Sequence, residues 1–325
     1  MHTFHRIALI ANPASQNGRV ASAIRYVLEG ASKLVGSGNV TLFETKCAGH
    51  GTKLARELGS HFDAVLAMGG DGLVHEVVNG LMAKDASERQ ALGVIPVGSG
   101  NDFASSLGMS SRWPKALKQV FEGEEHPIDL GCCNGEYFAE TLSFGIDAAI
   151  ALGTVSLRKR TNLHGAPLYA ASAVNQLATK LRRHEFRLEL ADGELVSYDD
   201  GQVVSVEPAG SLEGECYLLA AQNGPSYGGG FKVCPGARFD DGKLDLVLVR
   251  PPINPAQAAA LMARAKGGHH VSSPAFEFYR ARGFSLSFGD RVPTQLDGEP
   301  HIAPRFDVSV EPGALRVLAP DVSCR

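Results

Sequence analysis

The first third of the chain alternates short apolar runs with segments of helical periodicity, and two of the runs end at glycine-rich loops. A continuous apolar run of about four to eight residues is typical of a strand that is buried on both faces of a sheet. Such runs lie at residues 7–10, 40–43, 64–68 and 92–97. Between the last two, the i, i+3, i+4, i+7 spacing of an amphipathic helix is met by Val74, Val77, Val78 and Leu81. This order predicts an α/β domain in which helices cover a parallel sheet.

The pattern changes near residue 127, after which strand signals dominate. Asn134-Gly135 separates two extended segments, and an Asn-Gly dipeptide in that setting predicts a hairpin. Asp192-Gly193 is expected to turn the chain in the same way. Further strands are expected at residues 186–190, 203–206, 217–221, 244–249, 284–288 and 306–310, and helices at 168–181 and 255–265. We therefore expect a mainly antiparallel β domain over residues 127–305, after an α/β domain over residues 1–126. A strand near 306–325 can return to the first domain, and a cleft is expected between the two.

Composition narrows the possible function classes. Lys and Arg number 31 against 35 Asp and Glu, which gives a net charge of −4 and argues against a nucleic-acid partner. No apolar run approaches the roughly 20 residues of a membrane span, and the start of the sequence shows no signal peptide. The six cysteines have neither C-x-x-C nor zinc-ligand spacing. We therefore expect a cytoplasmic protein with reduced thiols.

Three loops marked by glycine follow predicted strands, at residues 12–18, 69–72 and 98–102. Ligands of open α/β sheets bind at the carboxyl ends of the strands, so we expect these loops to meet at one crevice. Gly69-Gly70-Asp71-Gly72 opens a helix, where backbone N–H groups favour an anion such as phosphate. Asp71 would repel phosphate unless Mg²⁺ lies between them or the carboxylate takes a proton. The simpler interpretation is a tight turn with Asp71 as the helix N-cap. The Walker A and G-x-G-x-x-G patterns are absent.

Five sequence blocks, in order along nearly the whole chain, resemble the catalytic domain family of diacylglycerol kinases. The blocks are N-P-A-S at 12–15, G-G-D-G-L-V-H-E-V-V-N-G-L at 69–81, P-V-G-S-G-N-D-F-A at 96–104, N…G-G-G…P-x-A…D-G-x-L-D at 223–245, and L-D-G-E-P at 296–300. The same family contains sphingosine, ceramide and bacterial lipid kinases. The resemblance implies an ATP- and Mg²⁺-dependent lipid kinase with a nucleotide-binding G-G-D-G loop. Its acceptor would be a lipid hydroxyl, diacylglycerol or sphingoid-like, and apolar walls of the β domain would hold the lipid chain.

The resemblance also implies roles for individual residues. The residues expected to surround ATP are Asn12, Ser15, Thr45, Gly69, Gly70, Asp71, Gly72, Glu76 and Ser99. Asp297 and Glu299 are expected to reach across the cleft, one of them as general base, and we favour Glu299, with Asp71 assisting through the metal. A structural Mg²⁺ is expected on the Asp241 carboxylate and the backbone carbonyls of Arg238 and Lys243. Asp241-Gly242 and Asp297-Gly298 are also typical hairpin turns, and both interpretations can hold together.

Two alternatives to a lipid kinase remain open at this point. The NAD kinase family shares the sheet and the G-G-D-G loop, but Gly100-Asn101-Asp102-Phe103 favours the lipid kinases. A catalytically weak sensor of nucleotide or lipid is favoured only by Leu73, which stands where the family usually has threonine. The expected partner is a lipid at a membrane surface, reached by peripheral association without a span. A homodimer is also possible, since bacterial members of the family form them.

Overall fold

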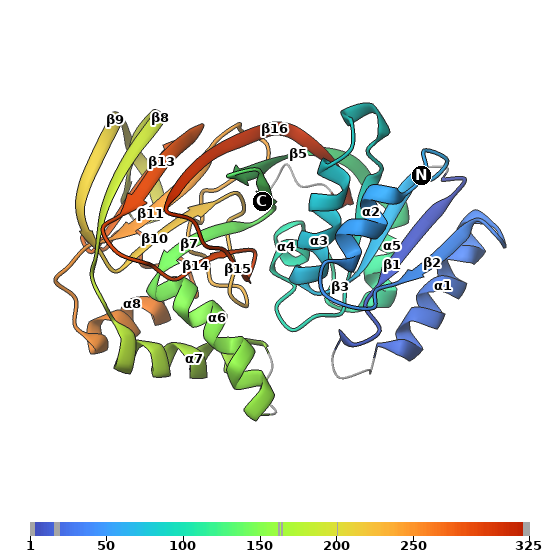
Figure 1. Cartoon of the computed structure of the whole chain (residues 1–325), viewed down its shortest axis with the longest axis horizontal. Helices are drawn as coiled ribbons and strands as arrows, with labels where there is room; N and C mark the ends of the chain where they lie inside the picture. Colours follow the sequence, from blue (N-terminus) through green and yellow to red (C-terminus); the bar gives the residue numbers. More distant parts are fainter. Residues whose placement is uncertain (1–3, 16–19, 162, 164, 200, 321–325) are drawn as a thin grey trace. The chain divides into compact units, whose positions relative to one another are not determined.

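The computed structural model describes residues 4–15, 20–161, 163, 165–199 and 201–320. The chain divides into two units. One unit extends to Asp129 and resumes at Pro312, and the other runs from Leu130 to Glu311 (Figure 1). Two long strands, β5 (Glu124–Cys133) and β16 (Arg305–Ala319), contain the points at which the chain passes from one unit to the other.

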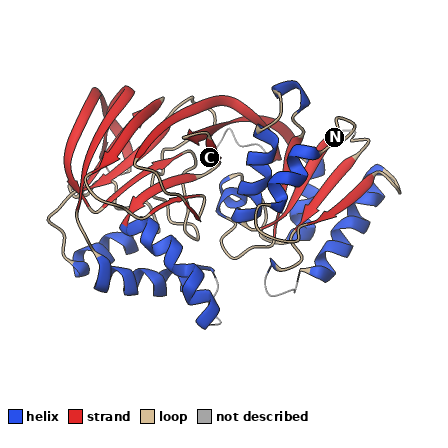
Figure 2. Ribbon diagram, viewed as in Figure 1, coloured by secondary structure: helices blue, strands red, loops and turns tan. Residues whose placement is uncertain are grey.

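The first unit is an α/β domain with a parallel sheet, as expected (Figure 2). Its strand order is β16-β4-β3-β1-β2, and these neighbours pair in parallel. The helices group as α2 with α3 and α1 with α5, and right-handed crossovers place these pairs on opposite faces of the sheet. The elements are β1 (Ile7–Ala11), α1 (Ala21–Val35), β2 (Val40–Glu44), α2 (His50–Glu57), β3 (Ala64–Gly69), α3 (Asp71–Met82), the 3₁₀-helix η2 (Ala86–Glu88), β4 (Ala91–Pro96), α4 (Asp102–Ser106) and α5 (Trp113–Glu122).

The three central strands of this sheet are buried along their full length. Every residue of β1, β3 and β4 is buried, which accounts for their continuous apolar sequences. Each fully buried Leu or Ile in these strands stabilises the unit by roughly 1.5–3 kcal/mol relative to exposure. The sheet therefore forms the buried core of this unit, and the loops that follow its strands lie at its edges.

The second unit is mainly antiparallel, also as expected (Figure 2). Its strands follow the order β15-β14-β7-β10-β11-β12-β8-β13-β16, with β9 on the other side of β8 and β6 on β5. The elements are β6 (Glu136–Phe138), β7 (Thr141–Gly145), α6 (Ile146–Arg160), α7 (Gly165–Lys180), β8 (His184–Asp199), β9 (Gln202–Cys216), β10 (Leu218–Gln222), β11 (Leu244–Val249), α8 (Pro255–Ala265), β12 (Phe276–Ala281), β13 (Gly283–Phe288), β14 (Thr294–Leu296) and β15 (Glu299–Pro300).

The predicted turn at Asp192-Gly193 is wrong, because β8 continues through it. Asp192 has φ +51°, and the register with β9 shifts between Glu189 and Gly193, so the dipeptide forms an irregularity within a strand. The chain reverses instead between Asp199 and Gln202. The Asn134-Gly135 turn is confirmed, since both residues have positive φ.

Helix α6, which begins directly after β7, was not predicted from the sequence. Gly145, with φ +78°, ends the strand and precedes the helix. The first two turns of α6 are almost entirely apolar, so they show no stripe of helical periodicity. Together with α7 and α8, this helix packs on one face of the antiparallel strands and forms an apolar core with Tyr217, Val249 and Ile253. Among the described residues, no helix is long and apolar enough to span a bilayer.

Candidate active site

The three predicted loops begin at one edge of the parallel sheet, where β1, β3 and β4 end. We call them the first, second and third loop in chain order. Asn12 N donates to Met68 O (3.2 Å) and Val97 N donates to Gly69 O (2.9 Å), so strand pairing continues into the loops. The described residues of the three loops therefore lie side by side, as expected, while the crevice stays a prediction. Residues 16–18 of the first loop lie outside the described residues.

Gly70 and Gly98 bring the second and third loops into direct backbone contact. A Cβ on Gly98 would lie 2.3 Å from Gly70 Cα, so neither position has room for a side chain. Asn101 closes the third loop from both sides: its Oδ1 accepts from Gly98 N (2.7 Å) and its Nδ2 donates to Gly98 O (3.1 Å). Ser99 lies half-buried within this closed turn. The glycine pair and the asparagine therefore fix the shape of the backbone at this edge.

Two carboxylates flank Gly100 in the third loop. Asp71 is the first residue of α3, and its Oδ2 accepts from Asn101 N at 2.8 Å. A Cβ on Gly100 would lie 2.8 Å from Asp71 Oδ2 and 3.2 Å from Asp102 Oδ2. The N-cap of α3 is Gly70, so the interpretation of Asp71 as N-cap is wrong. Mg²⁺ is commonly held by one or two carboxylates together with substrate phosphates, and this pair fits that chemistry. Sequence reasoning gave Asp102 no role, although its place in the third block was a usable signal.

Asn12, Ser15 and Thr45 lie at the same edge of the sheet. Asn12 Oδ1 accepts from Ala14 N at 3.0 Å, and Ser15 N donates to Asn12 O at 3.2 Å, so Asn12 shapes the start of the first loop. Thr45 follows β2, and its N–H donates to Ala11 O at 2.9 Å. The structure therefore brings these three residues beside the glycine-rich loops.

Glu76 connects α3 to the start of α2. Its Oε1 accepts from Gly49 N and its Oε2 from Gly51 N, both at 2.7 Å. These N–H groups belong to the N-terminal end of α2, where a carboxylate is favoured by unpaired donors and by the helix dipole. Glu76 thus holds α2 against α3, and its predicted contact with ATP stays a prediction.

Asp297 and Glu299 have contrasting surroundings in the second unit. Asp297 forms the β14–β15 turn with Gly298, and both have positive φ, +47° and +92°. The Asp297 carboxylate accepts three backbone N–H groups from residues 139–141, at 2.8–3.0 Å. The Glu299 side chain is exposed and has no hydrogen-bond or ion-pair partner among the described residues. The predicted hairpin turn at Asp297-Gly298 is confirmed.

The residues of the predicted structural metal site lie in the loop before β11. Asp241 is exposed, and its Oδ1 accepts from Lys243 N at 3.1 Å. The Lys243 ammonium pairs with Glu194 at 2.7 Å, and the Arg238 guanidinium pairs with Asp240 at 3.0 Å. Asp241-Gly242 is a bend in this loop and does not join two paired strands, so the hairpin interpretation is wrong there. In the described part of the chain, no three His, Cys, Asp or Glu side chains gather closely enough to hold a metal ion.

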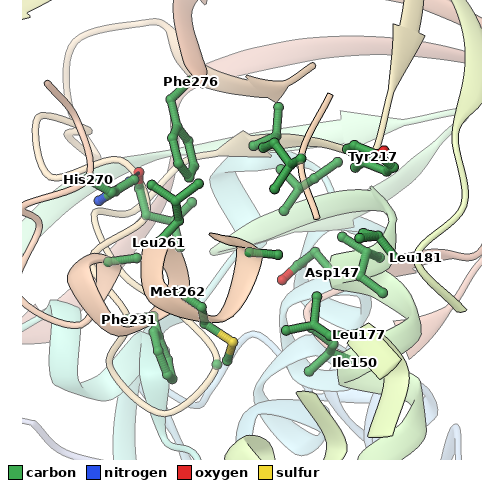
Figure 3. A pocket seen from close by; sticks show the side chains of 18 of the residues that line it. Asp147, Ile150, Leu177, Leu181, Tyr217, Phe231, Leu261, Met262, His270 and Phe276 are labelled. Carbon is green, nitrogen blue, oxygen red and sulfur yellow. Dashed lines mark hydrogen bonds between the residues drawn. The ribbon is translucent and has the colours of Figure 1, made fainter. Parts of the chain in front are cut away.

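An apolar pocket of about 800 Å³, its open mouth included, lies among α6, α7, α8 and the strands beside them (Figure 3). Its walls include Ile150, Leu177, Val249, Leu261, Met262 and Phe276. Figure 3 shows the carboxyl group of Asp147 pointing into this space among carbon side chains. Apolar walls were expected in this domain, but none of these residues was predicted from the sequence. An Asp inside the apolar run 144–151 was the available signal.

Asp147 is the acidic group of the pocket, and it is deeply buried. Burial raises its pKa, and hydrogen bonds from the Ser143 and Tyr227 hydroxyls offset part of the rise. His270 also lines the pocket; burial lowers its pKa, and its Nε2 lies 2.9 Å from Val233 O. Asp147 Oδ2 and His270 Nδ1 have no hydrogen-bond partner in the part of the chain that the structure describes. The pocket can therefore accept a long apolar group and offer hydrogen bonds to a polar end.

Comparisons with known proteins agree on both units. Residues 6–133 match the family model "Diacylglycerol kinase catalytic domain". Residues 140–319 match the model "YegS C-terminal NAD kinase beta sandwich-like domain". The name NAD kinase therefore occurs only in the description of the model that matches the second unit. The first unit, which carries the three loops, matches the model of the diacylglycerol kinases.

Curated relatives and a solved structure extend these matches over most of the chain. A protein of Chromohalobacter salexigens named "Probable lipid kinase YegS-like" is 32% identical over 85% of this chain and 82% of its own. The diacylglycerol kinase of Bacillus subtilis is 31% identical over 90% of this chain and 89% of its own. The crystal structure of a diacylglycerol kinase from Bacillus anthracis superposes with a TM-score of 0.70 at 20% identity, over 98% of both chains, and so shares the fold. The chain therefore belongs to the diacylglycerol kinase family of lipid kinases, which are phosphotransferases with an alcohol acceptor.

Proposed function

We propose that this chain transfers the γ-phosphate of ATP, with Mg²⁺, to the hydroxyl of a lipid that carries long apolar chains, such as a diacylglycerol or a sphingoid base. The observation that carries the proposal is the apolar pocket of the second unit, which combines hydrocarbon walls with the buried carboxyl of Asp147. An adenosine group would leave such walls in contact with polar atoms, which costs free energy. The pocket therefore favours a lipid over the NAD-like acceptor of the alternative.

The loops of the first unit are the proposed phosphate site. Backbone N–H groups at the start of α3 and in the third loop would donate to phosphate oxygens, as at other helix N-termini. The residues that would surround the nucleotide are Asn12, Ser15, Thr45, Gly69, Gly70, Asp71, Gly72, Glu76 and Ser99. Asp71 and Asp102 would hold Mg²⁺ with the ATP phosphates, because both carboxylates flank Gly100. When bound, the ion would neutralise charge on the transferred phosphate.

Glu299 is the proposed general base. A base needs an acceptor oxygen that is free to take a proton, and the exposed Glu299 carboxylate has no partner among the described residues. Asp297 is a poorer candidate because its carboxylate already accepts three backbone N–H groups. We therefore assign Asp297 to holding the turn and Glu299 to accepting the proton.

Three further features of the proposal rest on the family resemblance. The lipid is taken from a membrane surface by peripheral association. A structural Mg²⁺ is held by Asp241 with the carbonyls of Arg238 and Lys243; the exposed Asp241 carboxylate suits a hard cation, although one of its oxygens accepts from Lys243 N. The chain forms a homodimer. Vesicle flotation, magnesium titration of an Asp241→Ala variant and light scattering test these features separately.

The central experiment measures transfer of labelled γ-phosphate from Mg²⁺-ATP to a panel of hydroxyl lipids in mixed micelles. We expect one lipid class to be labelled, and Glu299→Gln to lower kcat at least about 100-fold, the range of general acid–base catalysis. Asp71→Asn should also lower kcat strongly, because it removes a charge that would hold Mg²⁺. Asp71→Asn keeps an oxygen that can accept from Asn101 N, so the fall in its kcat should not come from a disordered third loop.

Matched control variants separate catalysis from folding. Asp63 also accepts backbone N–H groups, from His5 and Arg6, but at the opposite end of β3, so Asp63→Asn should leave turnover unchanged. Glu207 is an exposed glutamate of the second unit, and Glu207→Gln should do the same. Labelling of no lipid, or of small polar alcohols alone, would overturn the proposal.

A further inference from the structure

We propose that His301 is a positioning residue for Glu299, and that it acts through a hydrogen bond to Glu136. We call this bond between His301 and Glu136 the clasp. The proposal rests on the proposed function, in which the Glu299 carboxylate accepts the proton of the lipid hydroxyl. All three residues belong to the second unit.

His301 extends the hairpin that carries Glu299. Strands β14 and β15 pair side by side as antiparallel neighbours, with Leu296 opposite Glu299 (Figure 1). His301 N donates to Thr294 O at 3.1 Å, which continues the same register beyond β15. Residues two apart on a strand project to the same face. The side chains of Glu299 and His301 therefore share one face of the hairpin.

The clasp fixes the His301 ring. His301 Nδ1 lies 2.8 Å from Glu136 Oε2, and because a carboxylate oxygen accepts, Nδ1 is the donor. The other ring nitrogen, Nε2, is buried and has no hydrogen-bond partner among the described residues. The side chain is 15% exposed, and its ring centroid lies 6.1 Å from that of Phe306. The bond to Glu136 therefore sets the orientation of the ring.

Two contacts hold the hairpin, one on each side of Glu299. Asp297, two residues before it, accepts the backbone N–H groups of residues 139–141. His301, two residues after it, bonds Glu136 at the start of β6. Both contacts reach the segment that contains β6 and leads into β7. The Glu299 side chain has no partner among the described residues, so its place depends on the backbone between these two contacts.

The two connections to Glu299 differ in stiffness. Gly298 separates Asp297 from Glu299, and glycine has the greatest conformational freedom of all residues. Pro300 separates Glu299 from His301, and the proline ring fixes its φ at about −65°. A displacement of His301 is therefore transmitted to the Glu299 backbone, whereas Gly298 can absorb a displacement of Asp297. This asymmetry makes the clasp the contact that sets the direction of Glu299.

Phosphorylation of the acceptor lipid in mixed micelles tests the clasp. We expect His301→Ala to lower kcat by about tenfold with the KM for ATP unchanged, since small displacements of a reacting group cost up to about 100-fold. The Nδ2 atom of asparagine takes the place of histidine Nδ1, so His301→Asn keeps a donor for Glu136 and should recover most of kcat. A loss in His301→Asn as large as in His301→Ala would overturn the proposal.

Double variants separate the clasp from the proposed base. If His301 acts through Glu299, His301→Ala should cause no further loss in a Glu299→Gln background. An equal loss in both backgrounds would mean a general structural effect and would overturn the clasp. Wild-type kcat in His301→Ala, with activity lost in Glu299→Gln, would overturn the clasp and leave the proposed function intact. Full activity in Glu299→Gln would overturn the assignment of the base, and the positioning role with it.

A matched histidine and a second readout complete the test. His184 is 6% exposed and its Nδ1 lies 3.1 Å from Asp290 Oδ1, but neither residue belongs to the β14–β15 hairpin; His184→Ala should keep kcat unchanged. Hydrogen exchange over residues 294–301 should be faster in His301→Ala than in the wild type, His301→Asn or His184→Ala. Protection that is identical in all four proteins would overturn the proposal even if activity falls.

Discussion

Leu73 lies in the first turn of α3, at the position where the family usually has threonine. The side chain is 6% exposed and packs between the second loop and α2: a Cβ on Gly69 would lie 2.6 Å from Leu73 Cδ2, and one on Gly51 3.0 Å from Cδ1. It is therefore part of the apolar support beneath the loops. Whether the missing threonine hydroxyl weakens catalysis stays a prediction to be tested.

Replacing Leu73 with threonine should reduce stability and leave catalysis nearly unchanged. Leu73→Thr leaves a cavity and buries a hydroxyl, so we expect the free energy of unfolding to fall by about 2–4 kcal/mol. Urea unfolding measures the loss, and kcat per folded molecule should stay close to wild type. A large rise in kcat/KM for ATP would instead place residue 73 at the phosphates.

Asp147 makes stability depend on pH in a predictable direction. Burial raises the pKa of its carboxyl above the ordinary value of 3.8. The folded state then holds the proton more tightly than the unfolded state, so the contribution of Asp147 to stability is greatest below about pH 4 and is lost as pH rises through its folded pKa. Asparagine has no such proton to lose. The stability of Asp147→Asn relative to wild type should therefore increase from pH 4 to pH 8.

Urea unfolding at each pH measures this difference. Asp192 supplies the control, since its side chain is 77% exposed and asparagine also tolerates its positive φ. The difference between Asp192→Asn and wild type should not vary with pH in this way. A difference for Asp147→Asn that is equally flat would contradict the raised pKa of this buried carboxyl.

At the scale of elements, the β14–β15 hairpin depends on Asp297. Its carboxylate ties the turn to the segment between β6 and β7 through three N–H groups, and hydrogen bonds to a charged group contribute about 1.5–3 kcal/mol. Asp297→Ala should lower the free energy of unfolding by roughly 2–4 kcal/mol. Asp297→Asn, which keeps an acceptor and tolerates positive φ, should lose less.

The neighbouring acid separates stability from catalysis. Glu299→Gln should unfold at the wild-type urea concentration but lose turnover. Asp297→Ala should lose both stability and turnover. Combined denaturation and kinetics on the two variants check this. A large stability loss in Glu299→Gln would show that Glu299 also holds the hairpin.

Local patterns predict the elements that carry one clear signal. Strands β1, β3 and β4 were readable because both faces are buried, which makes the sequence apolar throughout. The turn predicted at Asp192-Gly193 was wrong because a long paired strand can accommodate such a dipeptide as a local irregularity. Helix α6 was unreadable because its buried first half has no polar face.

The site shows the same division between local and tertiary information. The glycine loops were predictable because ligand-binding loops of parallel sheets follow strand ends. The hydrogen bonds from the start of α2 to Glu76 were not predictable, because its partners Gly49 and Gly51 are distant in sequence. Asp147 likewise gains its surroundings only when α6 packs with α7 and α8 around the pocket.

For the whole molecule, the proposed reaction assigns different tasks to the two units. The first unit supplies rigid loops with backbone donors and two carboxylates, and the second supplies the apolar pocket and Glu299. If the pocket holds the lipid chain, acceptor binding should respond to chain length while ATP binding should not. The contribution of each buried methylene is about 0.8 kcal/mol, or roughly fourfold in affinity.

Filling the pocket should therefore remove the preference for long chains. Met262 lies in the pocket wall on α8, and Met262→Trp adds bulk there. In wild type we expect the KM for the lipid to fall as acyl chains lengthen, until the pocket is full. In Met262→Trp this dependence should flatten and the KM for long-chain lipid should rise at least about tenfold, since overpacked walls leave no room for methylenes.

An exposed position provides the control for added bulk. Val174 on α7 is 69% exposed, and Val174→Trp should keep the chain-length profile of the wild type. The KM for ATP should be the same in all three proteins, because the proposed phosphate loops lie in the other unit. If Met262→Trp keeps the full preference for long chains, the lipid chain binds elsewhere.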